Sequence, residues 1–216
     1  MLTRIKICCI KSIEEARMAI EAGASAIGLV GRMPSGPGPI SDELIRVIAA
    51  SVPPPIATFL LTSETTARGI IAHHMRVNTS TIQIVDSMTE GSYNDIRTEL
   101  PAVKIVQVIH VIDESSVGEA VSISGDVDAL LLDSGNPSLK IKELGGTGRV
   151  HNWQLSRQIT DNSKCPVFLA GGLNPGNVRS AIEAVHPFGV DVCSGLRING
   201  NLDKDLLNGF INNVHM

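Results

Sequence analysis

Short apolar runs alternate along this chain with longer stretches whose apolar residues recur at helical spacing. The apolar runs predict strands at Arg4–Ile10, Ala26–Val30, Ile56–Leu61, Thr81–Val85, Lys104–Val111, Ala129–Leu132, Val167–Ala170 and Val190–Cys193. The intervening patterns predict helices at Ile13–Glu21, Asp42–Ala50, Glu64–His74, Tyr93–Leu100, Glu114–Ser122, Trp153–Thr160, Asn177–Val185 and Leu202–Asn212. Capping signals support several of these helices, such as Ser12 with Glu15 at the start of the first and Gly23 after its end.

These elements form eight consecutive strand–helix units. Continuous apolar strands that alternate with helices are typical of a parallel sheet covered on both faces. Eight strand–helix units with no extra antiparallel hairpin favour a closed (β/α)8 TIM barrel over an open doubly wound sheet. The missing G-x-G-x-x-G after the first strand also argues against a Rossmann fold. With 216 residues and no linker, we expect one α/β barrel domain over residues 1–216.

Composition narrows the class of protein further. The chain is 43% hydrophobic but only 3% aromatic, so aliphatic side chains must fill the interior. Its net charge of −4 and the absence of a basic tract argue against a nucleic-acid or membrane-surface partner. The N-terminal apolar run is too short for a signal peptide, and no segment is long enough to span a membrane. We therefore expect a cytoplasmic protein.

The four cysteines show neither C-x-x-C spacing nor a paired histidine pattern. A zinc site is therefore not expected. Reduced thiols in a cytoplasm are the simplest interpretation of Cys8, Cys9, Cys165 and Cys193.

Small residues follow the last two predicted strands. Gly171-Gly172 comes after one strand and Ser194-Gly195 after the next, where bare backbone N–H groups can approach an anion closely. In a parallel α/β barrel this is the expected place for a phosphate group. The alternative is that these glycines only form tight turns.

Three other strand positions carry candidate chemistry. Cys8 and Cys9 end the first strand, and because neighbours alternate, one is expected to face the barrel mouth and the other a helix. Each is equally compatible with a small buried hydrophobe. Asp133 ends the run ALLLD, either for chemistry or as an Asx-turn. Asp191 lies inside a strand and therefore needs a buried partner or a ligand.

The remaining candidates are less specific. The long loop after the sixth strand contains Gly145–Gly148, a donor-rich stretch that could close over a ligand. Among the histidines only His110 follows a strand, and the pair His73-His74 is expected on a solvated helix face.

Taken together, several motifs make the chain resemble phosphoribosylanthranilate isomerase. They occur in the family's order from the first strand to the eighth: KICCI at Lys6–Ile10, LLLDS at Leu130–Ser134, GGTG at Gly145–Gly148, His151-Asn152-Trp153, LAGGLNP at Leu169–Pro175 and GVDVCSG at Gly189–Gly195.

The resemblance implies a cofactor-free (β/α)8 isomerase of tryptophan biosynthesis. Such an enzyme converts N-(5'-phosphoribosyl)anthranilate to 1-(2-carboxyphenylamino)-1-deoxyribulose 5-phosphate by an Amadori rearrangement. By motif, Cys8 is implied as the general base and Asp133 as the general acid. A thiol acts as a base only when it is a thiolate, so Cys8 needs nearby positive charge, from Lys6 or the substrate iminium for example. The residues implied to bind substrate and its phosphate are Gly146, Gly171, Gly172, Asp191, Ser194 and Gly195.

Four positions depart from the family's pattern. Cys9 replaces the glycine of K-I-C-G, Val85 replaces a histidine, and Arg197 replaces a glutamate. The second loop reads MPSGPGPIS and lacks the arginine that binds the anthranilate carboxylate in the family. Arg32 lies a few residues earlier and is our candidate to compensate for it.

These departures leave two alternatives beside the isomerase. One is an isomerase of a different phosphoribosyl amine, and the other is a phosphosugar-binding paralogue without turnover. Retention of both Cys8 and Asp133 argues against the paralogue, which needs only the phosphate site. In every case we expect a small phosphorylated sugar-amine partner and a monomer or homodimer.

Overall fold

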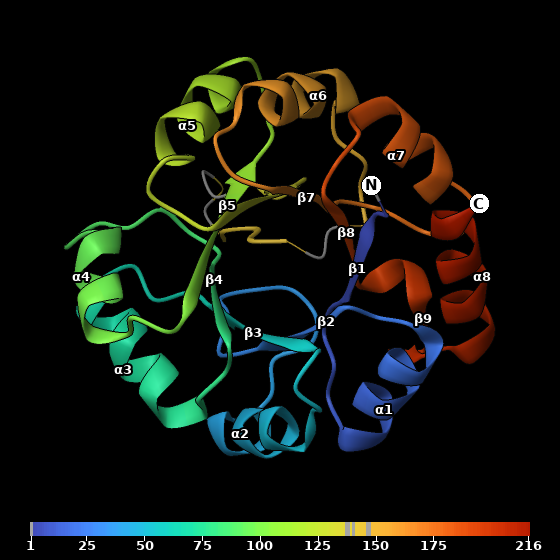
Figure 1. Ribbon diagram of the computed structural model, residues 1–216, viewed down its shortest axis with the longest axis horizontal. Helices are drawn as coiled ribbons and strands as arrows, with labels where there is room; N and C mark the ends of the chain where they lie inside the picture. Colours follow the sequence, from blue (N-terminus) through green and yellow to red (C-terminus); the bar gives the residue numbers. More distant parts are fainter. Residues whose placement is uncertain (1, 137–138, 140, 146–147) are drawn as a thin grey trace.

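Eight parallel strands close into a barrel in the computed structural model, and an outer ring of helices surrounds them (Figure 1). The structure describes residues 2–136, 139, 141–145 and 148–216. The barrel strands are β1 (Arg4–Ile7), β2 (Ala26–Val30), β3 (Ala57–Thr62), β4 (Thr81–Ile84), β5 (Lys104–His110), β6 (Ala129–Asp133), β7 (Val167–Leu169) and β8 (Gly189–Val192). The helices are α1 (Ile13–Ala22), α2 (Asp42–Ser51), α3 (Ala67–Val77), α4 (Tyr93–Glu99), α5 (Ser115–Ile123), α6 (Trp153–Asn162), α7 (Val178–Val185) and α8 (Lys204–His215). The predicted TIM barrel is confirmed.

The pairing of β1 with β8 closes the barrel and decides which residues meet at its mouth. Ile7 lies opposite Val192 in this pair, and the Cys8 N–H donates to the Val192 carbonyl at 2.8 Å. Residues that follow β1 therefore lie beside residues that follow β8, although more than 180 positions separate them in the sequence.

Two apolar clusters fill the molecule, and most of their side chains are aliphatic, as predicted from the low aromatic content. The larger lies between the sheet and the helices and includes Ile5, Ile7, Leu60 and Phe210. The smaller occupies the barrel interior, where Val30, Phe59, Val106 and Phe168 contribute. Since successive residues of a strand alternate between these two environments, both faces of the strands are mostly apolar. The buried polar residues Lys6, Gln83 and Asp191 are exceptions.

The predicted helix signals are confirmed at α1. The Ser12 hydroxyl accepts from the Glu15 N–H at 3.1 Å, and Gly23 ends the helix with φ 112°. A positive φ of this kind is comfortable only for glycine, which explains the residue at this position.

The expectation that His73-His74 forms a solvated face is wrong. Both imidazoles are buried on α3, the first between Thr62 and Asp42 and the second against the Thr79 carbonyl. The helix begins at Ala67 rather than at Glu64, because Thr66 provides its N-cap. His73 contacts β3 through Thr62 and α2 through Asp42, whereas His74 contacts the segment after α3 through Thr79.

The sequence analysis also missed a small antiparallel hairpin after β8. A 3-10 turn at Ser194–Leu196 leads into β9 (Arg197–Ile198), which pairs with β10 (Asn201–Leu202) before α8 begins. The two strands have only two residues each, too few for a periodic pattern. The hairpin lies beside the end of β1 and carries Arg197 to that point. Across the described part of the chain, no helix has the length and apolar character needed to cross a bilayer.

Candidate active site

A cavity opens at the carboxyl end of the barrel strands, where catalytic residues are found in this fold. Its walls include Cys8, Asp133 and Asp191 together with Gly171-Gly172 and Ser194. The structure thus brings together, from four different strands, the residues that the sequence analysis singled out separately. Apolar side chains complete the wall on the side of β2 to β4: Val30, Met33, Leu61 and Val85.

The loop after β2 and the loop after β6 meet over this cavity. The Ser35 hydroxyl donates to the Lys142 carbonyl at 2.5 Å. The free space between the described walls is about 70 Å³, whereas pockets for small-molecule ligands usually measure several hundred Å³.

Lys6 is the most unusual residue inside the barrel. It lies two positions before Cys8, so both side chains leave β1 on its inner face. The ammonium group is completely buried, donates to Asp191 Oδ1 at 2.8 Å and lies 5.2 Å from the centre of the Phe59 ring. Asp191 thereby has the buried partner that its position inside a strand required.

Gly28 on β2 leaves the space that Lys6 and Cys8 occupy. A Cβ atom at this glycine would lie 2.7 Å from Cys8 Sγ and 3.0 Å from Lys6 Nζ. Both distances are too short for a methyl group, so any larger residue would displace the thiol or the ammonium. The ammonium therefore lies close enough to influence the thiol.

Burial nevertheless dominates the chemistry of Cys8. Desolvation raises the pKa of its thiol to about 11, although the Lys6 charge and a hydrogen bond from Lys6 act in the opposite direction. The free protein therefore holds Cys8 as a thiol at neutral pH. A ligand that brings a positive charge into the cavity would favour the thiolate.

Alkylation kinetics test this protonation state. A pKa two units above the ordinary value lowers the thiolate fraction near pH 8 by roughly 100-fold, so iodoacetamide should modify Cys8 about 100-fold more slowly than an unfolded cysteine. The rate should rise with pH up to about 11. Peptide mapping distinguishes Cys8 from Cys165, and the same protein in denaturant is the control. A fast reaction at pH 7 would contradict the raised pKa.

Asp133 has a carboxyl group prepared to hold a proton. Desolvation raises its pKa to about 6, with a smaller contribution from the negative charge of Asp191, while the Ser134 N–H opposes the shift by donating to Oδ1 at 2.7 Å. Gly145 packs against this carboxylate, since a Cβ there would lie 2.5 Å from Oδ2. This contact goes to the next residue, whereas an Asx-turn bonds the N–H two residues on, so it fixes the carboxyl at the start of the loop without forming that turn.

The glycines after β7 and β8 have steric reasons for their identity. Gly171 and Gly172 have positive φ values of 81° and 62°. A Cβ at Gly172 would lie 2.7 Å from the backbone of Arg149, and one at Gly195 would lie 2.0 Å from the Leu173 carbonyl. Three backbone segments thus converge at this end of the cavity, and only glycine fits between them.

Cys9 does not behave as the sequence analysis expected. It was predicted to face away from the cavity if Cys8 faced it, and all four cysteines were expected to be reduced. Instead Cys9 also lines the cavity and forms a disulfide with Cys193, with a Cα–Cα distance of 5.9 Å. The alternation rule fails because β1 ends at Ile7 and Cys9 has a left-handed φ of 60°.

Three predicted site residues are not found in the described cavity wall. The Arg32 side chain is exposed and does not line the cavity, Gly195 lies next to the wall residue Ser194 without lining the cavity, and Gly146 lies outside the described residues. His110, the strand-end histidine, does not line the cavity, and its Nε2–H donates to the Val85 carbonyl at 3.0 Å. Among the described residues that form the wall there is no arginine or lysine.

Sequence reasoning missed one pairing, one glycine and one further contact that shape the site. The partnership of Lys6 with Asp191 had a signal, because a lysine and an aspartate in two apolar strands each demand an opposite charge. Gly28 within a strand was a second signal of close approach. The contact of Arg197 with the end of β1 had none, since it depends on the unpredicted hairpin. No group of three or more histidine, cysteine, aspartate or glutamate side chains that could hold a metal ion occurs in the described part of the chain.

Comparison with known proteins links this geometry to one family. Residues 5–213 match the family model described as N-(5'phosphoribosyl)anthranilate (PRA) isomerase. A protein of Methanosarcina mazei named N-(5'-phosphoribosyl)anthranilate isomerase 2 is 38% identical over 98% of this chain and 92% of its own. The isomerase of Methanocella arvoryzae is 32% identical over all of this chain and 99% of its own.

Solved structures of proteins from this family are also similar to this chain. Phosphoribosyl anthranilate isomerase from Thermotoga maritima superposes with a TM-score of 0.80 at 30% identity, with 98% of both chains covered. A further structure of such an enzyme, in complex with reduced 1-(o-carboxyphenylamino)-1-deoxyribulose 5-phosphate, has a TM-score of 0.77 at 28% identity, again with 98% coverage of both chains.

Proposed function

The chain belongs to the phosphoribosylanthranilate isomerase family, and we propose that Cys8 and Asp133 catalyse its reaction as general base and general acid. The protein is an isomerase of tryptophan biosynthesis that carries out the Amadori rearrangement of N-(5'-phosphoribosyl)anthranilate. The observation that best supports the two roles is the presence of a proton-holding carboxyl and a thiol in the walls of one cavity.

Asp133 acts first in this proposal. Its raised pKa lets a fraction of the carboxyl groups stay protonated near neutral pH, and the acid gives that proton to the ribose ring oxygen. The C1–O bond breaks, and the open-chain substrate becomes a Schiff base whose nitrogen carries a positive charge.

Cys8 then removes the proton from C2, and the electron pair of that C–H bond moves toward the iminium nitrogen. The product of this step is an enolamine, which tautomerises to the ketose. The iminium charge and Lys6 both favour the thiolate that this step needs, and they oppose the effect of burial. This explains how a thiol that is protonated in the free enzyme serves as the base once substrate is bound.

The phosphate of the substrate is proposed to bind at Gly171-Gly172 and Ser194-Gly195. The close approach of backbone segments at these glycines supports it, because it leaves no room for side chains between the peptide groups and an anion. Asp191 contacts the sugar in this proposal while it remains paired with Lys6. The apolar wall from Val30 to Val85 then faces the aryl ring.

Turnover of phosphoribosylanthranilate by the purified protein tests the proposed function. Loss of the substrate's fluorescence should follow enzyme concentration, and Cys8→Ser should abolish it without loss of phosphosugar binding. Absence of turnover with intact phosphosugar binding would favour the alternatives, an isomerase of another phosphoribosyl amine or a binding paralogue.

Arg32→Ala should leave both kcat and KM for phosphoribosylanthranilate within about twofold of the wild type. The Arg32 side chain is exposed and outside the cavity wall, so it cannot make the bidentate carboxylate contact from this position. Steady-state kinetics with Arg46→Ala, on the outer face of α2, provide the matched control. A rise in KM of tenfold or more would restore Arg32 as the carboxylate ligand.

The cytoplasm is the proposed location, since the enzyme serves amino-acid biosynthesis. A monomer or a homodimer is proposed for the assembly, because a solved relative from Thermotoga maritima at 27% identity is described as dimeric.

A further inference from the structure

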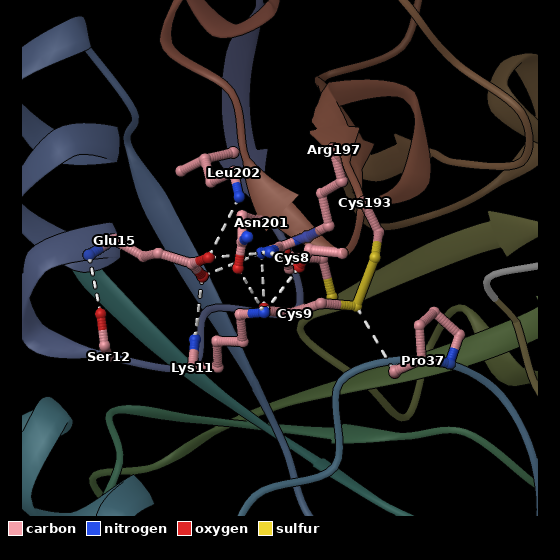
Figure 2. Close-up of polar contacts among 11 residues, drawn as sticks. Cys8, Cys9, Lys11, Ser12, Glu15, Pro37, Cys193, Arg197, Asn201 and Leu202 are labelled. Atoms are coloured by element: carbon pink, nitrogen blue, oxygen red, sulfur yellow. Dashed lines mark hydrogen bonds and ion pairs between the residues drawn. A yellow bond between two sulfur atoms is a disulfide. The ribbon is translucent and has the colours of Figure 1, made fainter.

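Arg197 reaches from the hairpin after β8 to the end of β1, where the proposed general base lies. Its side chain is 7% exposed. Figure 2 shows the guanidinium between the Glu15 carboxylate and the first residues after β1. Nη2 donates to the Cys9 carbonyl at 2.6 Å and to the Cys8 carbonyl at 3.3 Å. One guanidinium nitrogen therefore holds the two consecutive carbonyls that follow β1.

Glu15 holds the other side of the guanidinium. Its two carboxylate oxygens accept from Nη1 at 3.0 Å and from Nη2 at 3.1 Å, a bidentate pairing that fixes the plane of the group. The N–H groups of Lys11 and Leu202 donate to the same carboxylate, each at 3.1 Å. Arg197 is thus held from both sides, by a carboxylate that is itself fixed by the backbone.

The carbonyls that Arg197 holds have left the barrel ladder. The N–H groups of Cys8 and Ile10 still donate to strand carbonyls, at Val192 and Gly28. Between them, Cys9 has φ 60°, which a non-glycine residue adopts only when its surroundings impose it. Arg197 is well placed to impose it, because its two hydrogen bonds fix the peptide units on both sides of the Cys9 Cα.

We propose that Arg197 is a positioning residue for the general base, which it aligns by holding the carbonyls of Cys8 and Cys9. This inference rests on the proposed role of Cys8. The Cys8 carbonyl belongs to one of the two peptide units that flank the Cys8 Cα, and the Cys8 N–H on the other side donates to Val192. Holding that carbonyl therefore fixes the direction in which the Cys8 side chain leaves the backbone, and an error of about 1 Å at a reacting atom can lower a rate 100-fold.

The kinetics of Arg197→Met test the proposal. We expect kcat to fall roughly 10- to 100-fold while KM stays within about twofold, since the phosphate-binding glycines are untouched. Arg197→Lys should have an intermediate kcat, because an ammonium keeps the charge and some donors but loses the rigid fork. Arg179→Met, which breaks an exposed pair with Glu183 on α7, is the matched control and should leave kcat unchanged.

Chemical rescue separates positioning from a purely structural role. Arg197→Ala should regain part of its kcat when guanidinium or methylguanidinium is added at millimolar concentrations, with no rescue of Arg179→Ala. Glu15→Gln, which keeps the size of the side chain but replaces one accepting oxygen by an NH2 group and loses the charge, should lower kcat about three- to tenfold. If the Arg197 variants do not fold, the kcat of Glu15→Gln becomes the test. A Glu15→Gln protein with the same kcat as the wild type would overturn the proposal.

Three results would contradict the inference. Wild-type kcat in both folded Arg197→Met and Arg197→Lys would exclude positioning. A loss of activity matched by the loss of folded protein would reduce Arg197 to a structural residue. A rise in KM with unchanged kcat would place it in ligand binding. If the Cys8→Ser variant turned over substrate at the wild-type rate, the role of Cys8 itself would be refuted. Failure of the proposed function can therefore be told apart from failure of this inference.

Discussion

Asp133→Asn is expected to lower kcat by two to four orders of magnitude and, at neutral pH, to make the folded protein more stable. The loss of activity follows because an asparagine amide has no proton to give to the ribose ring oxygen, and general acid catalysis typically contributes 10²- to 10⁴-fold. Residual binding of the phosphorylated substrate should remain, since the glycines after β7 and β8 are unchanged. Single-turnover and steady-state kinetics at saturating substrate measure the effect.

The gain in stability follows from the raised pKa of Asp133. Its value of about 6 in the folded protein lies above the ordinary value of 3.8, so folding favours the protonated carboxyl. The wild type therefore loses stability as the pH rises from about 4 to about 6, and above that range the ionised carboxylate costs roughly 1 to 3 kcal/mol. Asparagine stays neutral, and denaturant unfolding of both proteins from pH 4 to pH 8 should show their difference growing over this range.

Asp128→Asn is the matched control for that experiment. Asp128 lies just before the opposite end of β6, where hydrogen bonds and the charges of Lys104 and Arg97 hold the pKa of its carboxyl below the ordinary value despite partial burial. Its substitution should leave kcat unchanged and destabilise the protein at neutral pH. An Asp133→Asn protein that is inactive and also less stable at pH 8 would contradict the proton-holding role, because disrupted packing would then explain both results.

Removing the Cys9–Cys193 disulfide is expected to lower the free energy of unfolding by about 2 to 5 kcal/mol in the absence of reductant. The bridge joins residues 184 positions apart, so in the chain-entropy account it restricts the unfolded chain strongly. Urea unfolding of Cys9→Ser, of Cys193→Ser and of the double variant measures the loss. The three values should agree within experimental error, since each variant removes the same bond.

Thiol titration provides an independent check. The unfolded wild type should show two reactive thiols before reduction, Cys8 and Cys165, and four after it. Cys165→Ser is the control, because this cysteine is free and its loss should barely change the difference between oxidised and reduced protein. Equal unfolding free energies for oxidised and reduced wild type would show that the bridge contributes nothing.

The disulfide also links stability to the proposed site. Cys9 adjoins Cys8, and Cys193 adjoins Ser194, so the bridge connects the end that carries the base with the end proposed for the phosphate. Breaking it should lower kcat less than Asp133→Asn does, because Arg197 still holds both carbonyls after β1.

The barrel architecture and the candidate site residues could be predicted from the sequence itself. Local features mark each element: the periodicity of strands and helices, caps such as Ser12 and breaks such as Gly23. Each strand–helix unit can therefore be recognised from about 25 consecutive residues. Eight such units allow few closed arrangements. This fold brings the carboxyl ends of all its strands to one end of the barrel. Cys8, Asp133 and the paired glycines could therefore be placed at that end from the sequence alone.

Only the tertiary structure decided how those residues behave. The pKa of Asp133 depends on how much water the neighbouring loops exclude, and the pairing of Lys6 with Asp191 requires β1 to meet β8. The same closure joins Cys9 to Cys193 and brings Arg197 to the end of β1. These are contacts between opposite ends of the chain, and no local pattern encodes them. The sequence thus determined which groups stand at the mouth of the barrel, while their protonation, pairing and alignment arise when the first and last strands close it.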